Sequence, residues 1–112
     1  PGTALALLQR AADRFEAVGA ETDLAITLIA TAEVQEHLLE FEQALATTDR
    51  FWSPQFARDW GRAICRAWVL AQNGRLQEAA TMAEFILAES DPTEEAALHA
   101  EAHALLARIA LE

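Results

Sequence analysis

The 112-residue chain contains no lysine and no tyrosine, and it has one cysteine, three prolines and four glycines. A single cysteine, Cys65, excludes an internal disulfide and favours a reducing compartment, so we expect a cytoplasmic protein. No run of apolar residues approaches the roughly 18 needed to cross a membrane, so we expect no membrane partner. Because glycine and proline interrupt helices, their scarcity leaves few places where a helix must end.

Positive charge is also scarce. The chain has 18 acidic and 8 basic residues, which gives a formal net charge of −10 and a pI near 4.6. Such a surface repels phosphate backbones, so we expect no direct binding of nucleic acid. All eight basic residues are arginine, and this usage together with abundant alanine is typical of a GC-rich bacterial genome.

The residues that are present favour one folded domain. Hydrophobic residues make up 53% of the chain, which excludes intrinsic disorder and is enough for a core. The length allows a single domain over residues 1–112, which we expect to be part of a longer protein.

Strong helix formers dominate, and turn signals divide the chain into six predicted helices. Two starts are marked explicitly: Ser53-Pro54 is typical of an N-cap followed by proline at the first helical position, and Asp91–Glu94 is typical of a capping box. The expected helices cover residues 3–18, 22–37, 41–48, 54–72, 76–89 and 92–112. We therefore predict an all-α fold.

Alanines recur at an interval of 35 residues. Ala32, Ala67 and Ala102 fall in the middle of the first helix of a proposed pair, whereas Ala44 and Ala79 fall early in the second helix. Small residues let antiparallel helices approach closely, and a period near 35 is typical of a two-helix solenoid unit. Turn signals also fall between the same alanines, which favours a repeat over coincidence in an alanine-rich chain.

One segment carries a family resemblance. Residues 63–87, AICRAWVLAQNGRLQEAATMAEFIL, resemble a tetratricopeptide repeat, with a small residue at Ala67, a glycine at the turn (Gly74) and the phrase GRLQEA after it. Residues 24–45 look like a degenerate copy with Leu39 in place of the turn glycine, and residues 98–106 look like the first helix of a third unit.

A second stretch of the chain extends this resemblance. The phrase RFEAVGAETDLAITLIATAEV is similar to the helical repeats of maltose-regulator-type activators and other bacterial signalling ATPases. The chain departs from the repeat pattern at Ala83, where an aromatic is usual, and at Pro92, which lies one residue late. The resemblance implies a right-handed α-solenoid of antiparallel helix pairs.

The resemblance also implies where a partner would bind. In tetratricopeptide units the first helix of each pair lines a concave groove, and this register selects one set of side chains. The predicted groove residues are Ile26, Ile29, Glu33, Glu36, His37, Ile64, Trp68, Gln72, His99 and His103. Trp68 lies outside the core arc of its helix. It is therefore either an exposed anchor for a partner or a packing contact with the adjacent unit.

A second candidate surface lies on the predicted fourth helix. Its expected core face carries Phe56, Trp60, Ala63, Ala67 and Leu70. Arg58, Arg62 and Arg66 follow the opposite side. They form either a basic strip that grips an acidic segment or a phosphate, or a solvent face balanced by glutamates of neighbouring helices, and the second interpretation is favoured.

No motif indicates catalysis. A phosphate-binding loop needs clustered glycines and a lysine, and Cys65 is expected to be a packed thiol because nothing nearby would lower its pKa. Glu95, His99 and His103, at spacings of four, are the best metal candidates. The residue after His99 is Ala100, so the HExxH pattern is absent, and a solvated or groove-lining face is favoured. We expect no enzyme activity, no cofactor and no metal.

The leading hypothesis is a non-catalytic protein–protein interaction or sensory module of a larger bacterial regulator, which binds a peptide or helix in its concave groove. Two alternatives remain open. One is a homodimer formed through exposed apolar faces, at Phe15 or at Leu105, Leu106 and Ile109. The other is a metal- or small-molecule-binding helical domain built on His99 and His103.

Overall fold

The computed structural model describes residues 2–112, and it is all-α. The helices are α1 (Gly2–Val18), α2 (Glu21–His37), α3 (Phe41–Asp49), α4 (Trp60–Gln72), α5 (Leu76–Glu89) and α6 (Ala96–Ala110), with a short 3-10 turn, η1 (Pro54–Phe56), before α4. Within these residues there is no strand. In the same part of the chain, no helix has both the length and the apolar character that a membrane crossing requires.

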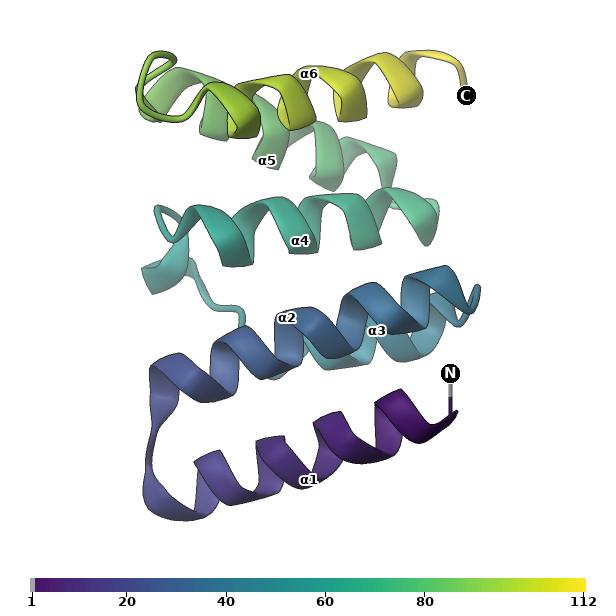
Figure 1. Ribbon diagram of the computed structural model, residues 1–112. Helices are drawn as coiled ribbons and strands as arrows, with labels where there is room; N and C mark the ends of the chain where they lie inside the picture. Colours follow the sequence, from purple (N-terminus) through teal and green to yellow (C-terminus); the bar gives the residue numbers. More distant parts are fainter. Residues whose placement is uncertain (1) are drawn as a thin grey trace.

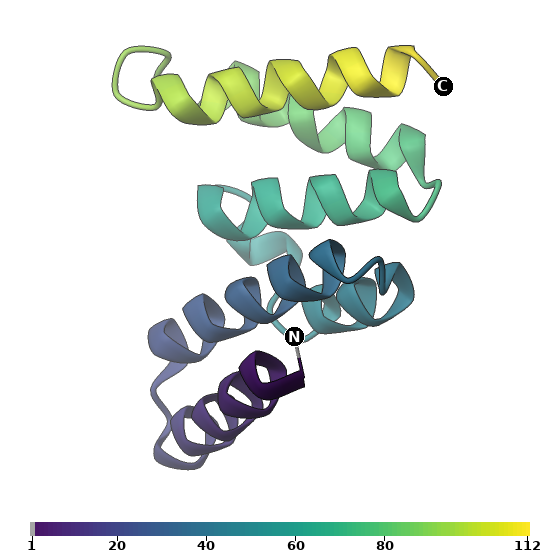
Figure 2. The ribbon, with the colours of Figure 1, turned by 45° about the vertical axis from the view of Figure 1, so that its right-hand side comes forward.

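The helices form an elongated stack in chain order. Successive helices run in opposite directions, and each packs on its neighbour in the sequence (Figure 1). The even-numbered helices also contact one another, α2 with α4 and α4 with α6. Turning the molecule by 45° shows α3 and α5 on the same side of this α2–α4–α6 layer (Figure 2). The prediction of six antiparallel helices is confirmed.

The alanines of the 35-residue recurrence lie where helices meet. Ala32, Ala67 and Ala102, in the middle parts of α2, α4 and α6, each have an exposed fraction of 0%. Ala44 on α3 and Ala79 on α5 are buried to the same extent. A side chain with only a methyl group lets two helix backbones approach closely. The recurrence therefore marks equivalent buried positions in alternate helices.

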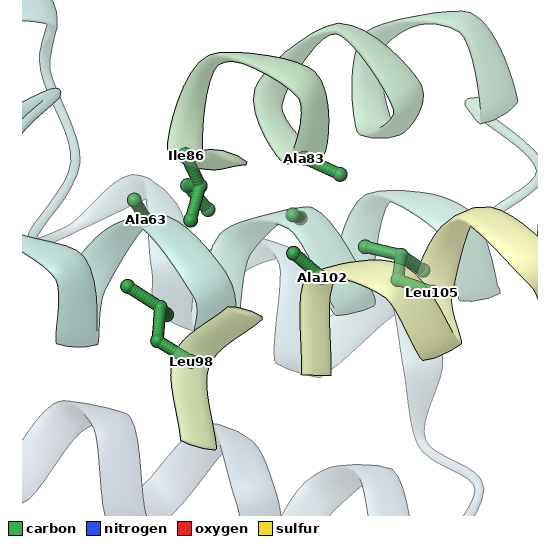
Figure 3. Packing of buried hydrophobic residues seen from close by; sticks show 7 residues of the cluster. Ala63, Ala83, Ile86, Leu98, Ala102 and Leu105 are labelled. Carbon is green, nitrogen blue, oxygen red and sulfur yellow. The ribbon is translucent and has the colours of Figure 1, made fainter. Parts of the chain in front are cut away.

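Two hydrophobic clusters make up the core. The first joins α4, α5 and α6, and its buried members are Ala63, Ala67, Ala83, Ile86, Leu98, Ala102 and Leu105 (Figure 3). The second joins α1, α2 and α4, and its buried members are Ala12, Leu28, Ala32, Phe51 and Cys65. Trp52, in the link between α3 and η1, packs against both clusters. Helix α4 contributes buried residues to each.

The predicted start of the fourth helix is wrong. Ser53-Pro54 begins only the 3-10 turn η1, and α4 starts at Trp60 with Asp59 as its N-cap, whose Oδ1 accepts a hydrogen bond of 3.3 Å from the Arg62 backbone N–H. Asp59 therefore supplies the side-chain acceptor that Ser53 was expected to supply. Phe56 consequently lies outside the helix and its predicted core face.

The sixth helix also starts later than predicted. Asp91 Oδ1 accepts hydrogen bonds from the backbone N–H groups of Thr93, at 2.7 Å, and Glu94, at 3.2 Å, as in one half of a capping box. These bonds stabilise a turn over residues 92–95, and α6 begins only at Ala96. The prediction that Asp91 caps the sixth helix is therefore wrong: its hydrogen bonds belong to the preceding turn, and Glu95 is the N-cap residue of α6.

Three helices end in the same left-handed turn. In the turns after α1, α2 and α4, the left-handed residues are Gly19, Leu39 and Gly74, with φ angles of 72°, 61° and 79°. After α2 the N–H groups of residues 39 and 40 donate to the carbonyls of residues 36 and 35, and after α4 residues 74 and 75 donate to 71 and 70. Leu39 and Gly74 are 35 residues apart. The turns after α2 and α4 thus share one backbone geometry, with leucine at the left-handed position in the first and glycine in the second.

We expect Leu39→Gly to raise the free energy of unfolding by about 0.5 kcal/mol. A left-handed conformation costs an L-residue with a side chain about 1–2 kcal/mol, part of which is offset because glycine is more flexible in the unfolded chain. The Leu39 side chain is 73% exposed, so little packing is lost. Urea denaturation followed by circular dichroism measures the change.

Two control substitutions complete this test. Leu38→Gly, at a residue with an ordinary φ of −85°, is expected to destabilise the protein. Gly74→Ala is expected to cost about 1 kcal/mol through backbone strain alone, since a Cβ at that position meets nothing within 4 Å. A loss of stability in Leu39→Gly would show that the leucine side chain makes a contact worth more than the strain.

Candidate functional site

A groove of about 470 Å³ lies along the α2–α4–α6 layer. Its lining residues come from three helices. They are Ile29, Glu33, Glu36 and His37 of α2, Gly61, Ile64, Cys65, Trp68 and Gln72 of α4, and Glu101 of α6.

The structure brings seven of the predicted groove residues together, four from α2 and three from α4. Their spacings of three and four place them on one face of each helix, and the direct contact of α2 with α4 sets the two faces side by side. Gly61 and Cys65 were not predicted, although their spacing from Ile64 and Trp68 puts them on the same face. Glu101 was also missed, and no signal in the sequence pointed to it.

Three of the predicted groove residues, Ile26, His99 and His103, are not among the lining residues. Ile26 lies exposed on α2. His99 faces the preceding helix, where its Nε2 lies 2.7 Å from Ser90 Oγ and 3.3 Å from the Ser90 carbonyl oxygen. Because the Ser90 hydroxyl donates to the Ile86 carbonyl, the imidazole N–H is the donor toward Ser90. His99 therefore fastens the start of α6 to the end of α5.

The residues considered for a metal do not assemble. The His99 and His103 ring centroids are 6.5 Å apart, and His103 lies exposed on α6. Across residues 2–112, no three His, Cys, Asp or Glu side chains are grouped as a metal site requires. The spacing of Glu95, His99 and His103 along the helix thus does not translate into a ligand cluster.

The three arginines of the proposed basic strip contact different parts of the fold. Arg58 precedes α4 and pairs with Glu89 at the end of α5. Arg62 donates to the Phe51 carbonyl at 3.0 Å and covers the Phe56 ring, with 3.7 Å from Cζ to the ring centroid. Arg66 donates to Thr48 Oγ1 at 2.9 Å and pairs with Asp49. The Arg62 and Arg66 side chains are only 11% and 12% exposed, so no continuous basic strip faces the solvent.

The apolar face expected at the C-terminal end is also mostly packed. Leu105 is fully buried in the α4–α6 cluster, and Leu106 and Ile109 are partly buried against it. The prediction that Leu105 belongs to an exposed face is therefore wrong. Phe15 on α1 is likewise half-buried.

The groove combines an apolar floor with unpaired carboxylates. Ile29, Ile64 and Trp68 supply apolar surface. Trp68 also packs against the cluster that joins α4, α5 and α6, whereas its role as an anchor for a partner stays a prediction. None of the ion pairs formed within residues 2–112 includes Glu33, Glu36 or Glu101. No arginine is among the described residues that line the groove. Its electrostatic potential is therefore negative.

Two titratable groups respond to this environment. Burial raises the pKa of Glu36 to about 7, a hydrogen bond with Gln72 acts in the opposite direction, and the negative charge of Glu33 raises the pKa further. Burial also raises the pKa of the Cys65 thiol to about 12, and the charges of Glu36, Glu33 and Glu101 add to this. Cys65 is therefore a protonated, unreactive thiol beneath the groove, as expected of a packed cysteine.

The raised pKa of Glu36 predicts a pH dependence of stability. The folded state keeps the Glu36 proton up to about pH 7, whereas the unfolded chain releases it near 4.5. Stability is therefore expected to fall as the pH rises between these two values. Above pH 7, we expect Glu36→Gln to raise the free energy of unfolding by about 1 kcal/mol, because the variant buries no charge. The effect is limited because part of the Glu36 side chain remains in contact with water.

Urea denaturation over a series of pH values measures this difference. Glu84→Gln, at an exposed position on α5, is the control and is expected to leave the pH profile of the parent unchanged. A parent profile that stays parallel to that of Glu36→Gln across the same range would show that Glu36 titrates normally.

Comparison with known proteins adds no relative. No protein-family model matches the sequence, and searches of curated proteins and of solved structures gave no match.

Proposed function

We propose that the chain is a tetratricopeptide-like interaction module, and that the groove along α2, α4 and α6 binds a segment of a partner protein. The observation that carries the proposal is the convergence of seven side chains, selected from the sequence as partner-binding residues, on one groove. The volume of about 470 Å³ lies within the roughly 300–1,000 Å³ typical of ligand sites. The module would be a non-catalytic part of a larger bacterial regulator in the cytoplasm.

The apolar and the polar residues of the groove would have different roles in recognition. Burying an apolar side chain of the partner against Ile29, Ile64 and Trp68 would supply most of the affinity, since aromatic anchors dominate interface energetics. The polar groups, among them His37 and Gln72, would fix the orientation of the segment through hydrogen bonds. A helix or an extended peptide presents side chains at the spacing that such a groove requires.

Selection from a displayed library of random peptides tests this proposal. We expect the protein to enrich a family of related sequences that bind the unmodified chain, and we expect Trp68→Ala to weaken their binding by roughly tenfold or more. Val18→Ala is the matched control, because it removes an exposed apolar side chain on α1, away from the groove. Circular dichroism confirms that both variants are folded. Enriched peptides that bind Trp68→Ala as tightly as the parent would overturn the proposal.

A further inference from the structure

The unpaired acidic groups of the groove indicate the chemistry of its occupant. Glu33 and Glu36 approach from α2 and Glu101 from α6, so carboxylates lie on both sides of the apolar surface that α4 supplies. Elsewhere in residues 2–112, Asp49, Asp59, Glu78 and Glu89 each pair with an arginine. Because no arginine pairs with the three groove carboxylates, the negative potential of the groove stays available to a ligand.

A buried acceptor at the same place points to a hydrogen-bond donor. Gln72 lines the groove, and its Oε1 atom is buried without a hydrogen-bond partner among the described residues. A buried carbonyl oxygen without a donor costs free energy, which a ligand N–H would recover. The Gln72 side chain also hydrogen-bonds with Glu36, so this acceptor lies beside the carboxylates.

We propose that the groove binds an arginine-bearing segment of the partner, with the guanidinium received by Glu33, Glu36 and Glu101 and stacked on the Trp68 indole; this inference rests on the proposed function. Arginine fits better than lysine because its planar group donates several N–H bonds in fixed directions while its face packs on an aromatic ring. A guanidinium carries five N–H donors, enough to pair with these carboxylates and to donate to Gln72 Oε1.

A foreign segment suits the groove better than a second copy of this chain. Arg10 and Arg14 of α1 are exposed and form no ion pair within residues 2–112, so a second copy offers basic groups. Each copy, however, carries a net charge of −10, and two such surfaces repel each other. A basic segment of another protein gains from the same field instead.

The groove charge is also set by pH. The titratable groups that line the groove together with Glu36 are Glu33 and His37 of α2, Cys65 of α4 and Glu101 of α6. The Glu36 pKa of about 7 means that the third carboxylate ionises close to neutrality. Because a bound cation favours the ionised form, affinity for an arginine segment is expected to rise several-fold from roughly pH 6 to pH 8.

Three matched peptides test the inference. The probes are a short capped helical peptide of alanine and leucine with two arginines one turn apart, its lysine counterpart, and its citrulline counterpart, which keeps the shape but removes the charge. Calorimetry gives the affinities, and NMR shifts of the Trp68 indole place the peptide in the groove. We expect arginine to bind about tenfold more tightly than citrulline, with lysine between them.

Variants of the protein assign the effect to the groove. The double variant Glu33→Gln/Glu101→Gln is expected to remove most of the preference for arginine over citrulline, and Glu36→Gln to remove the rise of affinity with pH. Glu42→Gln/Glu84→Gln, at exposed positions on α3 and α5, makes the same change in net charge away from the groove and is expected to keep the preference.

Each other outcome contradicts the inference in a distinct way. If the citrulline peptide binds in the groove as tightly as the arginine peptide, the groove binds segments but does not select arginine, and the proposed function stands. If no peptide shifts the Trp68 resonance and the library yields no binders, the proposed function fails as well. If the solution mass doubles and Arg10→Gln/Arg14→Gln restores the monomer, a second copy is the occupant and the inference is overturned.

Discussion

Leu105→Ala is expected to lower the free energy of unfolding by about 3 kcal/mol, the middle of the range for truncating a buried leucine. Leu105 is fully buried on α6, in the hydrophobic cluster that joins α4, α5 and α6 (Figure 3). The truncation removes apolar contacts and leaves a cavity between helices that cannot fully collapse. Urea denaturation followed by circular dichroism measures the loss.

A matched leucine and a second readout make this prediction decisive. Leu111→Ala, at a position that is 87% exposed, is expected to change stability by less than about 0.5 kcal/mol. Light scattering is expected to show the same solution mass for Leu105→Ala and the parent. A small loss of stability together with a reduced mass would instead place Leu105 in a dimer interface.

Ala102→Leu is expected to lower the free energy of unfolding by about 2 kcal/mol, because larger side chains in a well-packed core cost 1–3 kcal/mol. Ala102 has no exposed surface and lies where α6 meets α4, so three extra carbons must separate the two helices. Ala100→Leu is the control on the same helix. Ala100 is exposed, and leucine and alanine are both strong helix formers, so we expect a change of less than about 0.5 kcal/mol.

The same substitution can be tested at the equivalent alanines of the 35-residue recurrence. Ala32→Leu and Ala67→Leu, on α2 and α4, are expected to destabilise the protein at least as much. Equal stabilities of Ala102→Leu and Ala100→Leu would show that the two helices tolerate a wider separation, and that the recurrence of alanine has no packing role at α6.

The sequence predicts the repeated features of the fold well. The six helices and the buried alanines follow from helical spacing and from a period of 35 residues, whereas the groove face of α2 and α4 was implied by the resemblance to tetratricopeptide repeats. These features depend on local propensity and on which side chains share a helix face, both of which are encoded within a short stretch of chain. The groove faces of α2 and α4 then lie side by side because these two helices pack directly on each other.

The errors arise where contacts between distant residues decide the outcome. The side chain of His99 belongs to the expected groove register, but its hydrogen bonds to Ser90 direct it toward α5. Glu101 lines the groove in its place. The arginines of the expected strip are likewise held by groups on η1 and the ends of α3 and α5. No spacing within one helix reveals partners that lie 9 to 31 residues away.

The sharing of α4 between two hydrophobic clusters has a consequence for cooperativity. Cys65 of α4 belongs to the cluster with α1 and α2, Ala63 and Ala67 belong to the cluster with α5 and α6, and Trp52 packs against both. If α4 unfolds with one half of the stack, it exposes the hydrophobic cluster of the other half. We therefore expect a single unfolding transition rather than the stepwise unfolding of helix pairs. Because α4 also lines the groove, a partner bound there would stabilise all six helices against unfolding together.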